Sequence, residues 1–186
     1  MNQASKLTSA IVATACLLAA VVPEFALATS ATVTGNVNAG TLSISTSATP
    51  SFSVTLDGTD KTGSYSVPTT VTDATGSGSG WNLTITSTQF TTGGGSPHTL
   101  ATNASSITGV TNSCATSCVS PTNSITYPVG VPAGSSPPTA VKYFNAAVNT
   151  GQGQFTNTPS VSVSVPANSY SGAYTSTLTL AAVSGP

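Results

Sequence analysis

Short runs of alternating apolar and polar residues recur along the chain, separated by segments rich in Gly, Pro, Ser and Asn. Alternation with a period of two predicts β-strands that bury one face, and the intervening residues are typical of turns. We therefore predict an all-β fold, a single β-sandwich of Ig-like or Greek-key-like type with long Gly/Ser/Pro loops. The predicted strands are residues 31–37, 41–45, 52–56, 64–67, 70–73, 81–88, 106–110, 125–129, 140–144, 154–157, 160–165 and 173–182.

The strand that begins at Trp81 carries the only Trp of the sequence. Trp81, Leu83 and Ile85 leave one face of an extended chain, because side chains alternate along a strand. Burying a Trp contributes strongly to a small core, so we predict that this face points inward. Residues 140–148 are ambiguous, since Pro137-Pro138 before them also suits the start of a helical turn.

Two kinds of connection are expected between the strands. Asp57-Gly58 predicts a hairpin turn, because Gly tolerates positive φ and Asp bonds its own backbone. Residues 93–97 and 131–138 are Gly/Pro-rich and are expected to form exposed loops.

The N-terminus has the pattern of an export signal. Lys6 precedes an apolar run over residues 11–22, and Ala26-Leu27-Ala28 is a small-x-small cleavage site. We predict a signal peptide over residues 1–28 and a mature domain over residues 29–186. The apolar run is shorter than a membrane span, and Cys16 lies inside it, where the sequence context disfavours lipidation. The protein is expected to be extracellular, without a transmembrane segment.

Charged residues make up only 4% of the chain, and there is no Arg. Beyond residue 28 the charged residues are Asp57, Asp60, Lys61, Asp73 and Lys142. Binding nucleic acid or an anionic surface needs a cluster of Lys or Arg, so neither partner is expected. Disordered chains are usually low in hydrophobicity and rich in charge, whereas here 38% of residues are hydrophobic. A folded domain coated with Ser and Thr is therefore predicted.

Cys114 and Cys118 are the cysteines beyond residue 28. In an exported protein this pair predicts a disulfide that stiffens a surface loop. A metal or redox site would need further ligands or an activated thiolate, and the sequence offers no partner for either.

Residues suited to catalysis are scarce. His98 is the only His and lies in a loop, where we expect it to be idle. Asp57, Asp60 and Asp73 lack the dense spacing of a calcium loop, and residues 76–80 lead into a strand rather than the helix that a phosphate loop needs. We expect no enzyme, no cofactor and no metal site.

The chain resembles the WxL domain family of Gram-positive cell-surface proteins through two motifs. The first is Trp81-Asn82-Leu83. The second is the family's terminal Tyr-x-x-x-Leu-Thr-Trp-x-Leu-x-x-x-Pro, matched here by Tyr174, Leu178, Thr179 and Pro186. Leu180 stands in place of the second Trp and Ala182 in place of the last Leu.

This resemblance implies noncovalent attachment to the bacterial cell wall, to peptidoglycan or another wall glycan, and assembly with other surface proteins. It also implies that the binding residues are Trp81, Leu83, Tyr174, Leu178, Thr179 and Pro186. Trp81 offers an aromatic face that can stack on a sugar ring. The alternative is that Trp81, Leu83, Leu178 and Leu180 are core residues of two strands in one sheet or in facing sheets.

A second function class is a self-associating subunit of a surface coat, fibre or layer. Low net charge removes the repulsion that keeps proteins monomeric, and Thr/Val strands at a sheet edge can pair between chains. An enzyme is the third class.

Overall fold

The computed structural model describes residues 29–186, and within them it contains strands but no helix. The predicted signal peptide, with Cys16, lies outside the described residues. Within the described residues, contacts place residues 29–36 and residues 37–186 in separate units. The strands are β1 (Leu42–Ser45), β2 (Lys61–Ser66), β3 (Thr69–Asp73), β4 (Trp81–Thr88), β5 (Ser105–Cys114), β6 (Val129–Gly130), β7 (Ala133–Gly134), β8 (Val141–Ala146), β9 (Gly153–Val165) and β10 (Leu178–Ser184).

The first sheet is built on the long strand β9. Its order is β1-β3-β9-β5-β6, and β2 also pairs with β9. The 13 residues of β9 join two predicted strands, because the chain stays extended through Pro159. The carbonyl oxygen of Pro159 accepts a hydrogen bond from the backbone N–H of Val67, 3.1 Å away. β2 and β3 can therefore follow one another along the same side of β9.

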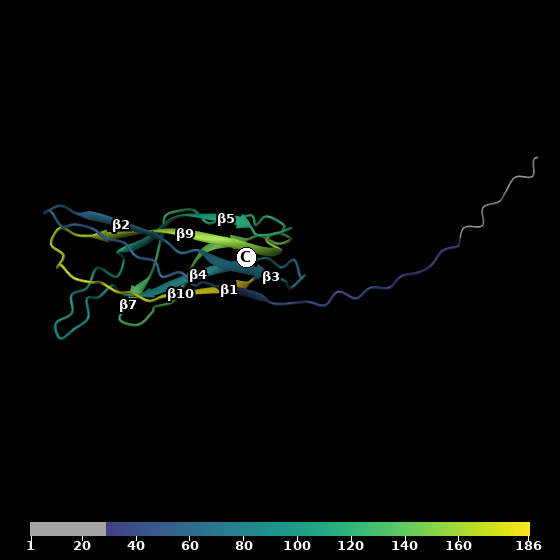
Figure 1. Cartoon of the computed structure of the whole chain (residues 1–186), viewed down its shortest axis with the longest axis horizontal. Helices are drawn as coiled ribbons and strands as arrows, with labels where there is room; N and C mark the ends of the chain where they lie inside the picture. Colours follow the sequence, from purple (N-terminus) through teal and green to yellow (C-terminus); the bar gives the residue numbers. More distant parts are fainter. Residues whose placement is uncertain (1–28) are drawn as a thin grey trace, which may run out of the picture. The chain divides into compact units, whose positions relative to one another are not determined.

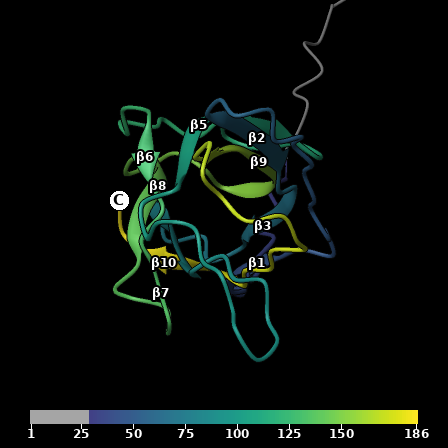
Figure 2. The same cartoon turned by 90° about the vertical axis from the view of Figure 1, so that its left-hand side faces the viewer.

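The second sheet is built on β4, the strand that begins at Trp81. β10 pairs with one side of β4, while β7 and β8 pair with the other. In Figure 1, β5 and β9 lie in one layer, and β4, β7 and β10 lie in the other. Figure 2 turns the view and shows β1 and β10, the edge strands of the two sheets, side by side. The predicted β-sandwich is confirmed.

The core fills the space between these layers. Trp81, Leu83 and Ile85 of β4 are fully buried, as the alternation predicted. The facing strand β9 contributes Phe155 and Val163, which are also buried. In β9 every second side chain is buried, and residues of both sheets belong to one hydrophobic core.

Some predicted elements differ from the structure. Residues 31–37 form no strand, and Val33 and Val37 are exposed. No ladder between the described strands includes residues 31–37, and an extended segment becomes a strand only within such a ladder. Residues 52–56 alternate between half-buried and exposed side chains but also form no strand, so the turn at Asp57 is not a β-hairpin.

Four further points concern the second half of the chain. Residues 140–148 hold strand β8 rather than a helical turn. Of residues 125–129, only Val129 belongs to a strand, and residues 173–177 precede β10 rather than form part of it. The loop 131–138 is not simply exposed, because Val131 is buried and the carbonyl oxygen of Pro132 accepts the backbone N–H of Ser87 at 3.0 Å.

Candidate functional site

The two sequence motifs lie side by side as antiparallel strands. Trp81 pairs with Ser184 and Leu83 with Ala182 across the β4–β10 ladder. Leu180, which replaces the family's second Trp, pairs with Ile85 and is half-buried. The two halves of the signature, about a hundred residues apart in sequence, are therefore one pair of neighbouring strands.

The Trp81 side chain is buried in the core. Its exposed fraction is 0%, and its indole Nε1 donates a hydrogen bond to the carbonyl oxygen of Gly151 at 2.8 Å. The rings of Phe144 and Phe155 lie 5.9 and 6.2 Å from it, centroid to centroid. Leu83 is equally buried. A sugar ring cannot stack on Trp81 while the core is closed. Trp81 and Leu83 are therefore observed as core residues.

The end of the second motif is fixed to the first. The side-chain amide of Asn82 donates to the carbonyl oxygen of Gly185 at 2.7 Å. The backbone N–H of Gly185 donates to the carbonyl oxygen of Gly80 at 3.0 Å. Lys142 Nζ donates to the carbonyl oxygen of Pro186 at 2.8 Å. These contacts tie Gly185 to the start of β4 and Pro186 to Lys142 of β8. Thr179 is exposed on β10.

The structure contains a groove of about 790 Å³, which we call the aromatic groove. Its two walls are residues 50–56 and 170–176. The remaining lining residues are Tyr65, Phe90, Leu100, Val165 and Leu178. None of the lining residues is charged. Tyr174 and Leu178 of the second motif therefore lie at this groove, whereas Trp81 and Leu83 do not.

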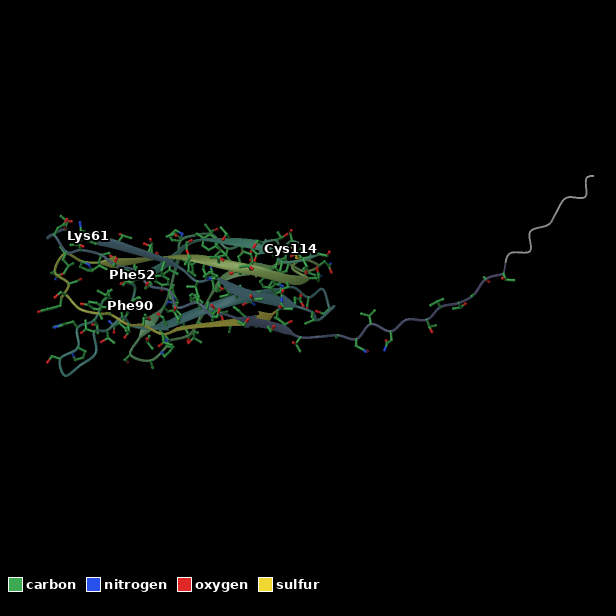
Figure 3. All side chains as sticks on the ribbon, viewed as in Figure 1. Phe52, Lys61, Phe90 and Cys114 are labelled. Carbon is green, nitrogen blue, oxygen red and sulfur yellow. A yellow bond between two sulfur atoms is a disulfide. The ribbon has the colours of Figure 1, made fainter. Side chains whose placement is uncertain are left out.

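Aromatic packing shapes the interior of the groove. The Phe52 ring stacks on Tyr65 at 6.1 Å and meets Phe90 edge-on at 5.7 Å. A side chain on Gly63 would overlap the Phe52 ring, so this glycine makes room for the ring against β2. Burial raises the pKa of Tyr65 to about 12. Figure 3 shows Phe52 and Phe90 near Lys61, at the end of the sandwich opposite Cys114.

An aromatic cluster borders the groove, formed by the exposed Tyr170 and the half-buried His98 and Tyr174, and we call it the tyrosine rim. The rings of His98 and Tyr170 are parallel, with centroids 3.6 Å apart. The hydroxyl group of Tyr174 donates to the carbonyl oxygen of Tyr170 at 3.0 Å. Tyr170 is 63% exposed. Sequence reasoning missed Tyr170, although a large aromatic in a loop between two strands was the available signal.

The predicted disulfide is present between Cys114 and Cys118, whose Cα atoms are 6.1 Å apart. Cys118 packs against Gly153, at the start of β9. The disulfide thus ties the end of β5 to a loop residue that packs on the start of β9, far from the aromatic groove (Figure 3).

The acidic residues serve separate turns. Asp57 accepts hydrogen bonds from Thr59 and pairs with Lys61 at 2.7 Å, and the Lys61 ammonium is the main cause of its lowered pKa. Asp60 accepts the N–H of Ala167. Among residues 29–186, no three His, Cys, Asp or Glu side chains lie close enough to share a metal ion.

The glycine-rich segment before β4 forms a chain of hydroxyl groups. Asp73 accepts a hydrogen bond from Thr75, and the hydroxyl groups of Thr75, Ser77 and Ser79 follow one another at 2.9 and 2.6 Å. The segment connects β3 to β4, so it leads into a strand as the sequence indicated.

Comparisons with known proteins agree with the two motifs. A family model described as WxL domain, surface cell wall-binding, matches residues 29–186. No curated protein and no solved structure matches the chain. In the described part of the chain, no helix is long and apolar enough to cross a membrane. The match covers most of the chain and includes both motifs, and the chain belongs to the WxL domain family of surface cell wall-binding domains, which makes it an extracellular, cell-wall-associated protein.

Proposed function

We propose that this protein attaches noncovalently to peptidoglycan and that the tyrosine rim contacts the glycan. It acts by binding, without catalysis. The observation that carries the proposal is Tyr170, a large aromatic side chain that is 63% exposed and held in place by its stack on His98. The family match supports attachment to the cell wall in general.

The chemistry of the rim suits a carbohydrate. An aromatic ring offers an apolar face to the C–H groups of a sugar, while a tyrosine hydroxyl group can bond a sugar hydroxyl group. The stack with His98 fixes the Tyr170 ring before binding, so less side-chain conformational entropy is lost when the glycan binds. Because Trp81 is buried, Tyr170 of the rim offers the exposed aromatic ring that Trp81 does not.

Co-sedimentation with washed peptidoglycan sacculi tests the proposal. We expect Tyr170→Ala to bind roughly fivefold more weakly, because an aromatic contact contributes roughly 1 kcal/mol. Tyr170→Phe keeps the ring and should retain most of the binding. Val183→Ala is the matched control, since Val183 is also an exposed apolar residue, on β10. Circular dichroism confirms that each variant is folded.

Two results would contradict the proposal at different levels. If the wild-type protein stays in the supernatant, attachment to peptidoglycan is wrong. If Tyr170→Ala sediments as well as the wild type and Val183→Ala do, attachment stands but the rim is not the contact. Binding should persist at high salt, because salt screens interactions between charges and the chain carries few charges that could contribute to binding.

A further inference from the structure

One wall of the aromatic groove has a free backbone edge. Thr175 exchanges backbone hydrogen bonds with Thr91 at 2.9 and 3.0 Å, and the carbonyl oxygen of Thr177 accepts the N–H of Thr88. Backbone groups alternate sides along an extended chain, so Tyr174 and Ser176 direct theirs to the opposite edge. Within residues 29–186, no backbone–backbone hydrogen bond reaches those groups. This wall is an edge that can accept another strand.

The other wall is also extended and unpaired. Phe52, Val54 and Leu56 are half-buried against the core, while the residues between them are exposed. Over the part of the chain that the structure describes, residues 50–56 make no backbone–backbone hydrogen bond. The groove thus combines apolar side chains with unsatisfied backbone, which suits an extended polypeptide with an apolar face.

This chain carries a segment with that character. Residues 31–37 read Ala-Thr-Val-Thr-Gly-Asn-Val, with small or apolar residues at every odd position and polar residues between them. The Val33 and Val37 side chains are 91% and 97% exposed. Seven extended residues span about 23 Å, the same length as the seven-residue wall 50–56. The segment and the groove lining both lack charge, so no ion has to leave water when they meet.

We propose that residues 31–37 of one copy add as a strand to the edge at Tyr174–Leu178 of a second copy and place Val33 and Val37 in its aromatic groove. Each copy then offers both a donor segment and an acceptor groove. Such a head-to-tail contact builds chains of subunits rather than a closed dimer unless the rotation closes a ring. This goes beyond wall attachment, because it gives the exported protein a means of assembling on the surface.

Sedimentation velocity of the exported protein, purified from the cell surface, is the first test. Mass spectrometry first confirms that residues 31–37 are retained. We expect association that grows with concentration, and at least tenfold weaker association for the double variant Val33→Asp/Val37→Asp. The matched control, Thr32→Asp/Thr34→Asp, puts the same two charges on the opposite face of the strand and should associate like the wild type.

The location of the contact is tested separately with a synthetic peptide of residues 30–40. Added to the ¹⁵N-labelled double variant Val33→Asp/Val37→Asp, it should shift the amide signals of residues 50–56 and 174–178. The same peptide with both valines replaced by Asp should not. A wild type that is monomeric at all concentrations, equal association of the two double variants, loss of residues 31–37 by processing, or shifts confined to other residues would each overturn the proposal.

Discussion

Trp81 and Gly151 hold each other in place. The indole Nε1 of Trp81 donates a 2.8 Å hydrogen bond to the Gly151 carbonyl oxygen, so the polar edge of the buried ring is satisfied. Gly151 has a φ of 79°, and a Cβ atom there would lie 2.7 Å from that same nitrogen. The ring that names the motif therefore depends on a glycine 70 residues later in the chain.

Gly151→Ala should lower the free energy of unfolding by roughly 3 kcal/mol, because it combines an unfavourable positive φ with overpacking against Trp81. Urea unfolding followed by Trp fluorescence measures the change. Gly94→Ala is the control, since Gly94 has a φ of 87° and open space around it. Gly94→Ala should lower the free energy of unfolding by only about 1 kcal/mol, the cost of the positive φ alone. Equal losses would show that contact with Trp81 is unimportant.

Trp81→Ala should destabilise the fold by roughly 3 to 5 kcal/mol, as expected for a large aromatic removed from a core. Trp81→Phe keeps an aromatic ring in the core, so its loss of stability should be smaller than that of Trp81→Ala. It still leaves the Gly151 carbonyl oxygen without its donor, so it should be less stable than the wild type. Thermal unfolding by circular dichroism measures both variants. The fraction of Trp81→Phe that remains folded should bind sacculi like the wild type. Reduced binding by that folded fraction would give Trp81 a direct role that its burial argues against.

Replacing both Cys114 and Cys118 by Ser should lower the free energy of unfolding by about 2 kcal/mol, the chain-entropy value for so small a ring. Sacculus binding should not change, because the disulfide and the groove lie at opposite ends of the sandwich. Urea unfolding of the oxidised and reduced wild type provides a second estimate without any substitution. A loss of binding in the folded variant would mean that the two ends are coupled.

Stability should fall at alkaline pH. Burial raises the pKa of Tyr65 to about 12 from its ordinary 10.0, and it raises the pKa of Tyr143 as well. Between pH 10 and 12 the unfolded chain loses the Tyr65 proton and the folded chain keeps it. The unfolded state then binds fewer protons, so the free energy of unfolding decreases by up to about 1.4 kcal/mol per pH unit for each such tyrosine.

Urea unfolding at several pH values from 9 to 11.5 measures this slope. Tyr65→Phe removes the Tyr65 contribution and should give a shallower decline above pH 10. The same slope in the variant and the wild type would show that Tyr65 titrates normally in the folded protein.

Much of the architecture follows from local sequence. Alternation located β4, the second half of β9 and the inward face of Trp81, because every second side chain leaves the same face of a strand. It did not show that Asn82 and Thr86, on the other face of β4, are also buried. The pairing of Cys114 with Cys118 also followed, since they were the cysteines beyond the predicted signal peptide. The two motifs predicted the family without any knowledge of strand order.

Other features were decided by tertiary structure. Alternation alone made residues 31–37 and 52–56 look like strands, but a strand exists only where a partner satisfies its backbone, and partners are not local in sequence. The pairing of Trp81 with Ser184 and the stack of His98 on Tyr170 join distant segments in the same way. The sequence by itself determined the all-β pattern, the apolar faces of β4 and β9, and which family the chain resembles. Only the folded arrangement decided that Trp81 is enclosed and that Tyr170 is exposed beside the groove, because enclosure depends on what packs against a residue from elsewhere in the chain.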